Sequence, residues 1–520
     1  MIFGEYDVKA EAGIGGYHFR HIYLYGAGKY GKKYLRLLQA EGICVTAFIT
    51  TEYEISTYCG LPVYGVNDIS PLITEKDWVI LAYKGADSTE VGQRFCHIKP
   101  HIIHYDSPKI RHFMKYETFF APIVRRLQKQ FQNPHTLRKQ ALWKSFLVIR
   151  LDAIGDVVCT TALIRELKHN YPKAKLTVVV RKETEPLLKD CPYINNLILF
   201  DGKQGKGELI EDWKDFENID EKVSAYAAEY FSDKYFDAVF LPTEILCGRS
   251  GVEELLLALY SKADCRIGHL VDCDNYRRWM YGMVKTLFSK VVYQIYPMHE
   301  TMFQLDMLRD CGLTIVNDKT ELWVNKGSKK KIEVLLKEDG TSADDILIAV
   351  GLVGSIQVRN WKAQNYNELF HVFDTKYEGK VKFIILGGED ALGWASELEK
   401  NERTIIDLTG RLSLAESMAC IQKCDAYVGS NTGLLHIADA LDKPSVTIYA
   451  ELEDGSDWDG DSPARYGSRK EGSIALIPPA GLDGCHGYCR KEFSHCINQI
   501  TPTQVEQAIE QILPRLGNNR

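Results

Sequence analysis

The sequence lacks most of the features that mark membrane, secreted or nucleic-acid-binding proteins. No apolar run approaches the roughly 18 residues needed to span a bilayer. The first residues, MIFGEYDVKAEAG, carry acids and lack the basic, apolar and small-residue order of a signal peptide. The net charge of −7 disfavours nucleic acid as the main partner, because phosphate binding needs a basic surface. These absences predict a cytoplasmic protein that does not bind nucleic acid.

Paired cysteines are also missing as a pattern. The 14 cysteines are scattered through 520 residues, mostly inside apolar segments such as GICVTAF and GDVVCTTAL, which is typical of buried free thiols. Hydrophobic content of 45% and charged content of 26% are those of an ordinary globular protein. The length exceeds what one core supports and predicts about three domains.

A small Rossmann-like domain is predicted for residues 1–118. The segment HIYLYGAGKYGKKYLRLLQAEGICVTAFIT indicates a strand, a glycine turn, a helix and a second strand. Gly26, Gly28 and Gly31 form G-x-G-x-x-G at that turn, the context of a nucleotide-binding fingerprint. The second strand ends in AFITTEYE, without the clear acid that would hold an adenosine ribose. The domain resembles small Rossmann-like domains found beside bacterial sugar-modifying enzymes, and this resemblance implies a nucleotide, nucleotide-sugar or assembly role. No candidate for hydride chemistry follows within the domain, so an NAD(P)-dependent oxidoreductase or epimerase is the alternative.

Residues 119–144 are predicted to form a helical linker. Their basic side chains, in APIVRRLQKQFQNPHTLRKQALWK, spread round the helix, and large apolar residues are few. A solvated linker is therefore favoured. Peripheral contact with anionic lipid at the inner face of the cytoplasmic membrane is the alternative.

Two further α/β domains are predicted for residues 145–330 and 331–520. Apolar runs of strand length, including FLVIRL, LTVVVR, DDILIAVG and VKFIILGG, alternate with helical segments in both. Continuous apolar strands indicate parallel sheets covered by helices on both faces. Such sheets bind ligands at the carboxyl ends of their strands, so we expect a cleft between the two domains.

The last domain contains two loops that favour phosphate. CDAYVGSNTGLLHIADAL predicts a strand, a turn with Asn431, Thr432 and Gly433, and a helix whose free N–H groups attract anions. His436 lies one turn into that helix, where a ligand contact and a structural role are equally compatible with the spacing.

A second group of candidates follows the first and second strands of that domain. Ser355, Arg359 and Lys362 occupy one loop, where cations would neutralise a diphosphate. Glu389 and Asp390 follow the next strand, where they would accept hydrogen bonds from ribose hydroxyls or cap a helix.

The stretch IRLDAIGDVVCTTALIREL passes from strand to helix at Gly155 and Asp156. An acid there is explained by a helix cap or by a catalytic base. Asp152, four residues earlier, is interpreted as a polar loop residue.

From about residue 145 to 515 the chain resembles glycosyltransferase family 9, the lipopolysaccharide heptosyltransferases and their relatives. The matching pieces are IRLDAIGDVVCTTALIREL, MHETMFQLDMLRDCG, NWKAQNYNELF, IILGGED and GRLSLAESMACIQKCDAYVGSNTGLLHIADAL. The resemblance implies the GT-B architecture and inverting transfer from a nucleotide-activated sugar, typically ADP-heptose, with no cofactor required. It places Asp156 on the family's catalytic aspartate.

Two departures from the family bear on the donor. Arg359-Asn360-Trp361 stands where relatives often have Lys-x-Trp, and Asn431 stands where some have an aspartate that contacts the sugar. The sequence does not identify the acceptor, which is a lipopolysaccharide or other cell-surface glycan precursor, a lipid-linked sugar or a protein. A catalytically silent nucleotide-sugar-binding scaffold is a further alternative.

A cysteine cluster lies near the C-terminus, in GCHGYCRKEFSHC. Cys485, Cys489 and Cys496 accompany His486 and His495 with a spacing that differs from a zinc ribbon. The spacing is compatible with buried thiols, with a disulfide and with a structural iron or zinc site. Relatives that modify autotransporter proteins have a similar cluster and bind iron there.

Overall fold

The computed structural model describes most of the chain. The described residues are 21–40, 44–51, 56–74, 77–82, 102–104, 123–131, 137, 142–201, 213–244, 248–271, 282, 284–294, 297–354, 356–399, 403–453, 455, 462–482, 485, 489, 493–514 and 516. Ser355 and His486 from the sequence analysis lie outside them.

Two compact units make up the chain. The first comprises residues 1–132, 211–213 and 272–286, and the second comprises residues 133–210, 214–271 and 287–520. The second unit holds both large α/β domains, here called the first lobe and the second lobe. The domain boundaries at residues 118, 144 and 330 stay predictions.

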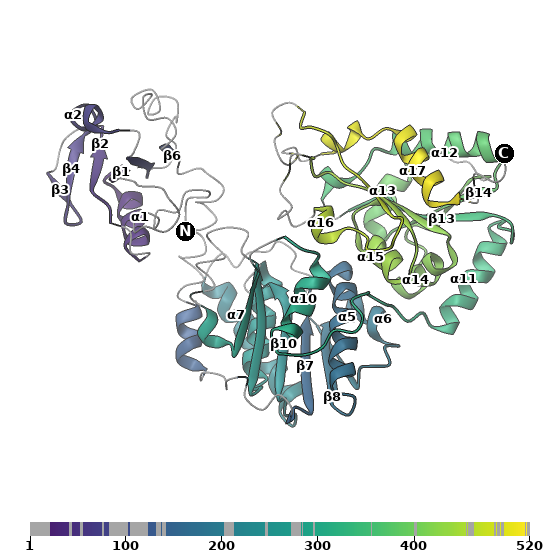
Figure 1. The fold of residues 1–520 in the computed structure, drawn as a ribbon, viewed down its shortest axis with the longest axis horizontal. Helices are drawn as coiled ribbons and strands as arrows, with labels where there is room; N and C mark the ends of the chain where they lie inside the picture. Colours follow the sequence, from purple (N-terminus) through teal and green to yellow (C-terminus); the bar gives the residue numbers. More distant parts are fainter. Residues whose placement is uncertain are drawn as a thin grey trace. The chain divides into compact units, whose positions relative to one another are not determined.

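The first unit has a six-stranded sheet in the order β3-β4-β2-β1-β5-β6 (Figure 1). All its pairs are parallel except the β3–β4 hairpin. The elements are β1 (Ile22–Tyr25), α1 (Lys29–Ala40), β2 (Ala47–Thr50), β3 (Thr57–Tyr58), β4 (Leu61–Gly65), α2 (Val66–Ile69), β5 (Trp78–Leu81) and β6 (Ile102–His104). Residues 123–130 of the predicted linker are helical.

The glycine turn after β1 has the backbone that the sequence pattern requires. Gly26 has φ of +116°, a conformation open to glycine. A Cβ on Gly31 would lie 1.9 Å from the carbonyl oxygen of Gly26, so helix α1 packs against the turn only because residue 31 is glycine. Next to Gly28, by contrast, a Cβ would meet nothing within 4 Å.

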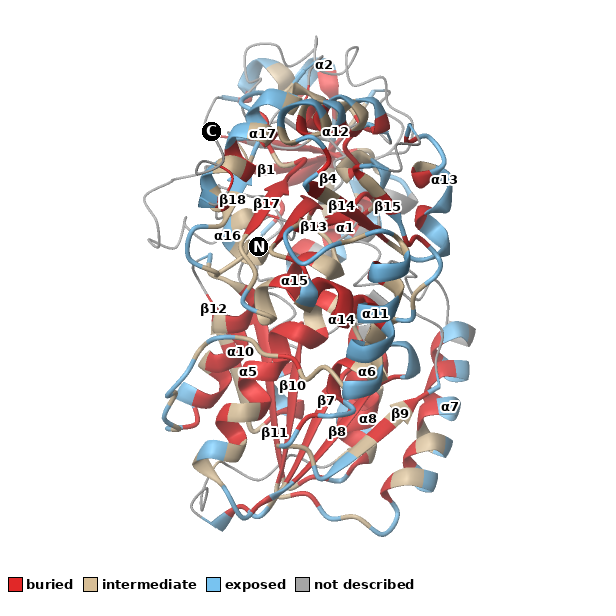
Figure 2. Ribbon diagram, turned by 90° about the vertical axis from the view of Figure 1, so that its right-hand side faces the viewer, coloured by how far each residue is buried: buried red, intermediate tan, exposed pale blue. Residues whose placement is uncertain are grey.

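The first lobe is built on a six-stranded parallel sheet in the order β12-β11-β10-β7-β8-β9. Its strands are β7 (Ser145–Arg150), β8 (Lys175–Arg181), β9 (Asn196–Phe200), β10 (Ala238–Glu244), β11 (Cys265–Val271) and β12 (Lys290–Gln294). Its helices are α5 (Ile154–Asn170), α6 (Glu185–Leu188), α7 (Trp213–Phe231), α8 (Gly248–Tyr260) and α10 (Glu300–Arg309). Strands β7, β8, β10 and β11 are buried on both faces, as the apolar runs predict (Figure 2).

The second lobe repeats the plan with the order β15-β14-β13-β16-β17-β18, again all parallel. Its strands are β13 (Ile346–Gly351), β14 (Val381–Leu386), β15 (Ile405–Asp407), β16 (Ala426–Ser430), β17 (Ser445–Ile448) and β18 (Ile474–Leu476). Its helices are α11 (Lys326–Glu338), α12 (Ala363–Tyr377), α13 (Leu392–Ala395), α14 (Leu414–Lys423), α15 (Gly433–Ala440), α16 (Pro463–Tyr466) and α17 (Pro502–Ile512). Thr501 caps α17, and its side chain accepts a hydrogen bond from the N–H of Gln504.

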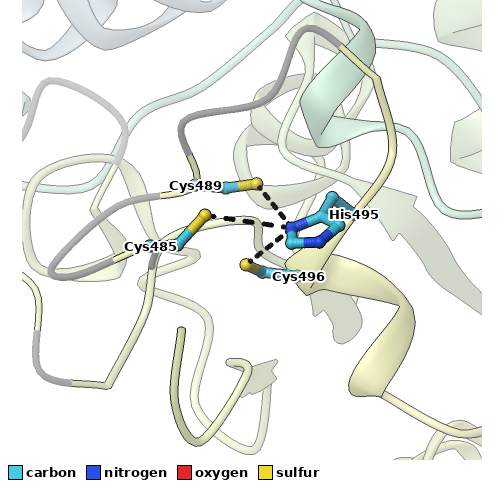
Figure 3. A group of neighbouring side chains, drawn as sticks. All are labelled: Cys485, Cys489, His495 and Cys496. Carbon is cyan, nitrogen blue, oxygen red and sulfur yellow. Dashed lines mark hydrogen bonds between the residues drawn. The ribbon is translucent and has the colours of Figure 1, made fainter. Parts of the chain in front are cut away.

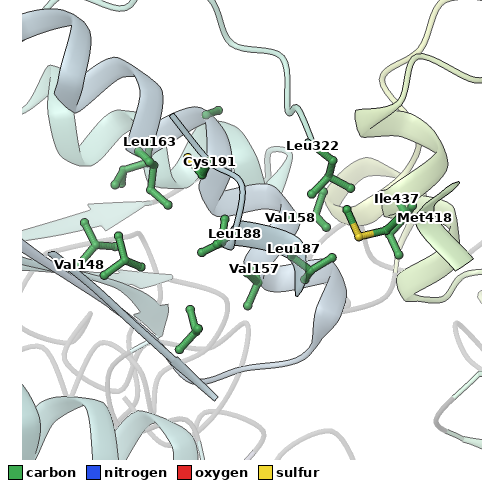
Figure 4. Close-up of a cluster of buried hydrophobic side chains, with 14 of the residues drawn as sticks. Val148, Val157, Val158, Leu163, Leu187, Leu188, Cys191, Leu322, Met418 and Ile437 are labelled. Atoms are coloured by element: carbon green, nitrogen blue, oxygen red, sulfur yellow. The ribbon is translucent and has the colours of Figure 1, made fainter. Parts of the chain in front are cut away.

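One hydrophobic cluster joins the two lobes. Val157 and Val158 of α5 share it with Met418 of α14 and Ile437 of α15, and Leu322 from the connection between the lobes completes it (Figure 4). These residues are 9% exposed or less. The cluster holds the N-terminal end of α5 against the second lobe, and that end carries Asp156.

Among the described cysteines all thiols are free, and most are buried. Cys44 of GICVTAF is exposed, so the prediction of a buried thiol is wrong there, because the strand begins only at Ala47. No described helix combines the length and the apolar character that crossing a bilayer demands.

Candidate active site

A cavity of about 590 Å³ lies between the lobes. The first lobe contributes the N-terminal turn of α5, and the second lobe contributes the loops that follow β13, β14, β15 and β16. The lining residues are Ala153, Ile154, Gly155, Asp156, Val353, Gly354, Arg359, Leu386, Gly387, Gly388, Asp390, Ala391, Leu412, Leu414, Ser417, Asn431, Thr432, Gly433, Leu434, His436 and Tyr466. The cleft predicted from the two sheets is therefore present at the ends of β7 and β16.

Asp156 uses both carboxylate oxygens. Its Oδ2 accepts a hydrogen bond from the backbone N–H of Ala153 at 3.2 Å, which caps α5. Its Oδ1 accepts one from the hydroxyl of Tyr466 at 3.0 Å and lies 3.1 Å from Nη2 of Arg150. The side chain is 14% exposed. The helix cap is thus real, and it leaves the other oxygen for contacts across the cleft.

Arg150 stands at the centre of a buried charge network. Its Nε lies 3.3 Å from Asp152, and its Nη2 lies 3.4 Å from Glu300 as well as close to Asp156. Asp152 also accepts a hydrogen bond from the Thr243 hydroxyl at 2.5 Å, so it belongs to this network and is more than a polar loop residue. Burial lowers the pKa of Arg150, but the surrounding carboxylates outweigh it and raise that pKa well above its ordinary value.

Glu300 connects this network to the second lobe. Its Oε2 accepts from Nη2 of Arg465 at 3.1 Å and from Nε of the same side chain at 3.3 Å. Burial raises the pKa of Glu300, yet Arg465 and Arg150 overcome that effect and lower it to about 2. The carboxylate is therefore charged and shared between one arginine from each lobe.

The turn after β16 meets the N-terminus of α5 closely. Thr432 caps α15, with its Oγ1 accepting from the N–H of Leu434 at 3.2 Å. A Cβ on Gly433 would lie 2.8 Å from Ile154, and a Cβ on Gly155 would lie 2.4 Å from the His436 ring. Both glycines therefore permit the two helix N-termini to approach each other. His436 packs on this turn, which is a structural role, and it also lines the cavity, while a contact with a ligand stays a prediction.

Arg359 lines the cavity in a loop that is held at several points. Its carbonyl oxygen accepts from the Ser430 hydroxyl at 2.8 Å, and the neighbouring Asn360 Oδ1 accepts from the N–H of Gly354 at 2.7 Å. Burial lowers the pKa of Arg359, and Glu451 partly offsets this effect. A guanidinium in this position supplies a planar donor for an anionic ligand.

The other predicted donor residues differ in their placement. Lys362 is exposed at the start of α12 and does not line the cavity, and Glu389 is also exposed and outside it. Asp390 lines the cavity instead of its neighbour. Two residues that sequence reasoning missed, Arg465 and Tyr466, sit on α16, a helix of four residues with no motif that marks it.

The cysteine cluster closes into a compact group of four. The Nδ1 atom of His495 lies 3.9 Å from Sγ of Cys485, 3.6 Å from Sγ of Cys489 and 3.3 Å from Sγ of Cys496 (Figure 3). All four ligand atoms lie within 4.8 Å of one another. The three predicted cysteines are thus brought together, and His495 is the fourth member.

The two lobes are similar in sequence to known proteins. Residues 316–456 match the model of glycosyltransferase family 9 (heptosyltransferase). The chain is 22% identical to lipooligosaccharide heptosyltransferase 2 of Haemophilus ducreyi over 378 residues, which are 71% of this chain and 99% of that protein. The chain is a glycosyltransferase, and it is similar to family 9 over these residues.

Solved structures have the same fold as the two lobes of this glycosyltransferase. A family 9 glycosyl transferase from Veillonella parvula has a TM-score of 0.56 at 19% identity and covers 72% of this chain and 98% of its own. The ADP-heptose heptosyltransferase II of E. coli has a TM-score of 0.51 at 17% identity, with 71% and 99% covered. The predicted GT-B architecture of two facing Rossmann-like lobes is confirmed. The first unit lies outside the residues that match the family 9 model.

Proposed function

We propose that the protein transfers a sugar, heptose or a similar one, from a nucleoside diphosphate to a hydroxyl group, with inversion at the anomeric carbon. The acceptor would be a lipopolysaccharide or other cell-surface glycan precursor, and the reaction would take place in the cytoplasm. One observation carries this proposal. The carboxylate of Asp156 and the anion-attracting N-terminus of α15 face the same inter-lobe cavity.

The residues suit an inverting displacement. Asp156 takes the proton of the acceptor hydroxyl as its oxygen forms a bond to the anomeric carbon. The bond from that carbon to the diphosphate oxygen breaks, and the electron pair leaves on the nucleoside diphosphate. Arg359, Thr432 and the N–H groups of α15 border the cavity and would stabilise this charge.

The donor is proposed to be ADP-heptose or a related nucleotide sugar. The similarity to heptosyltransferases supports heptose, whereas Asn431 at the cavity offers an amide in place of the acid that some relatives present. A thermal-shift panel with ADP-heptose, UDP-, GDP- and dTDP-sugars, NAD and NADP decides the point. A ligand at 100 times its Kd stabilises the fold by about 2.7 kcal/mol. A response to NAD(P) alone would overturn the transferase proposal in favour of the oxidoreductase alternative.

Asp156→Asn is the direct test of the base. We expect donor binding in the thermal-shift assay to persist and transfer to fall by about 10²- to 10⁴-fold, because an amide cannot accept the proton. The matched control is Asp233→Asn, which makes the same change at a side chain that is 81% exposed. Transfer at the wild-type rate by the Asp156 variant would remove its assigned role. Firm donor binding by the wild type without transfer to any acceptor would favour the scaffold alternative.

We further propose that Cys485, Cys489, Cys496 and His495 hold a structural metal ion, iron or zinc. In a tetrahedral site the sulfur and nitrogen ligands lie about 3.6 Å apart, as follows from metal–ligand bonds of about 2.3 and 2.05 Å. The separations of 3.3 to 3.9 Å in the cluster fit this value. The ion would supply cross-links within a loop. Elemental analysis of the purified protein should find about one equivalent of the ion.

The N-terminal unit is proposed to bind a nucleotide or nucleotide sugar at the turn formed by Gly26, Gly28 and Gly31. The open space beside Gly28 and the close packing at Gly31 support this, because a fingerprint of this kind needs room for phosphate and tight helix packing at those two positions.

A further inference from the structure

Tyr466 reaches the Asp156 side chain from the second lobe. Its hydroxyl donates to Oδ1 at 3.0 Å, and 310 positions in the sequence separate the two residues. Resting on the proposed function, we propose that Tyr466 is a positioning residue of the transfer reaction. It orients Asp156 as a base, and it does so only when α16 is seated against the first lobe.

Several contacts hold helix α16 in place and fix the phenol ring of Tyr466. Ser462 caps the helix, and Arg465 at its end pairs with Glu300 in the first lobe. The His436 ring meets the phenol at 5.7 Å in an edge-on arrangement, and the Arg465 guanidinium lies 5.4 Å from its centroid. Nε2 of His299 in the first lobe lies 3.0 Å from the carbonyl oxygen directly after Tyr466, that of Gly467.

The hydrogen bond from Tyr466 makes the two carboxylate oxygens of Asp156 different from each other. Oδ1 is bonded by Tyr466 and faces Arg150, whereas Oδ2 has the backbone N–H of Ala153. The more heavily bonded oxygen is the weaker base, so Oδ2 is the atom that takes the acceptor proton. Burial and the nearby Asp156 raise the pKa of Tyr466 well above its ordinary value, which keeps the phenol a donor at working pH.

This arrangement links the base to closure of the lobes. Arg150 comes from β7, in the same lobe as Asp156, so it stays beside the carboxylate whatever the second lobe does. Tyr466 comes from the second lobe and also lines the cavity. The hydrogen bonds of the base are therefore complete only while the two lobes are held together, as the shared hydrophobic cluster holds them in this structure.

Tyr466→Phe tests the inference, because it keeps the ring between His436 and Arg465 and removes only the hydroxyl. A hydrogen bond to a charged group is worth roughly 10- to 100-fold in rate, so we expect kcat to fall by that factor. The KM and Kd of the donor and the Tm should stay near the wild-type values. Tyr235→Phe is the matched control, since its hydroxyl is bonded to Asp264 away from the cavity.

The double variant Asp156→Asn/Tyr466→Phe distinguishes a residue that positions Asp156 from one that contacts the substrate directly. If Tyr466 acts through Asp156, adding Tyr466→Phe to Asp156→Asn causes no further loss. An equal further loss, an unchanged kcat in the single variant, or a fall in donor affinity alone would each overturn the inference. Should Asp156→Asn itself retain full activity, the proposed function fails instead, which keeps the two failures distinct.

The pH profile of kcat supplies a second measurement that packing alone would not move. Loss of a donor to the carboxylate should shift the acidic limb to higher pH in Tyr466→Phe. Arg150, Glu300, Arg465, His436 and Cys159 are charged or titratable groups around this position, and the substitution leaves all five in place. An acidic limb at the wild-type pH would contradict the assigned role.

Discussion

The ion pair between Arg465 and Glu300 makes the attachment of the lobes measurable. The two side chains are 12% and 2% exposed, and their closest atoms lie 3.1 Å apart. Arg465→Met removes the charge with little loss of length, leaving Glu300 with Arg150 at 3.4 Å and Gln304 at 3.3 Å. The carboxylate then keeps only its weaker partners in a site that water does not reach.

The expected cost follows from breaking a buried pair. Removal of one partner typically costs about 3–5 kcal/mol, and the contacts that remain to Glu300 put this case near 3 kcal/mol. Unfolding entropy is about 2.1 cal/mol/K per residue, so a cooperative unit of roughly 375 residues loses about 4 °C in Tm. Differential scanning calorimetry resolves such a change.

Two further variants decide whether the reasoning is right. Arg309→Met breaks an ion pair with Asp306 on the same helix, but Arg309 is 40% exposed, so about 1 kcal/mol or less should be lost. Glu300→Gln combined with Arg465→Met removes both charges and should recover most of the stability. A Tm for Arg465→Met no lower than that of Arg309→Met would refute the argument.

Acid should weaken the same contact. The pKa of Glu300 in the folded protein is about 2, below its ordinary 4.5, because Arg465 and Arg150 outweigh burial. A depressed pKa gives stability that is present above pH 4.5 and is lost as the pH falls from there through 2. In Arg465→Met this pH dependence should be shallower, since part of its cause has been removed.

The remaining predictions concern the cavity turn and the cysteine cluster. Gly155→Ala places a methyl group 2.4 Å from the His436 ring, so a loss of about 1–3 kcal/mol in thermal unfolding and weaker donor binding are expected; an unchanged Tm would show that the ring can move aside. Cys489→Ser should lower the metal content and weaken donor binding. The second effect is expected because Ser494, next to His495, donates to the carbonyl oxygen of Asn360 at 2.5 Å, and Asn360 adjoins the cavity residue Arg359. Ser462→Ala, away from the cluster, should leave the metal content as it is.

The sheets were predictable because burial leaves a local signature. A strand covered by helices on both faces must be apolar at every position, so runs such as FLVIRL mark β7 with an error of one residue at either end. The turn residues that favour phosphate were found for a similar reason. A helix that begins directly after a strand exposes free N–H groups, and the sequence shows where that change of period occurs.

Side-chain direction within a loop has no comparable signature. Lys362 and Glu389 belong to loops that border the cavity, yet both point to solvent, while the adjacent Asp390 lines it. The charge network was missed because its partners are remote in sequence. Arg150 and Glu300 are 150 positions apart, and Arg465 and Glu300 are 165 apart. Ordinary charged residues give no sign of such pairing until the fold brings them together.

The acid between strand and helix shows how one residue serves both stability and the proposed chemistry. A cap needs a carboxylate oxygen directed at the first backbone N–H, and Oδ2 of Asp156 meets that need from within its own lobe. This bond fixes the side chain at the edge of the sheet that borders the cavity between the lobes. Oδ1 is then presented to Tyr466 and Arg150 without a further cost in side-chain entropy. Asparagine retains an oxygen for the cap and loses the charge, so Asp156→Asn should affect transfer far more than folding.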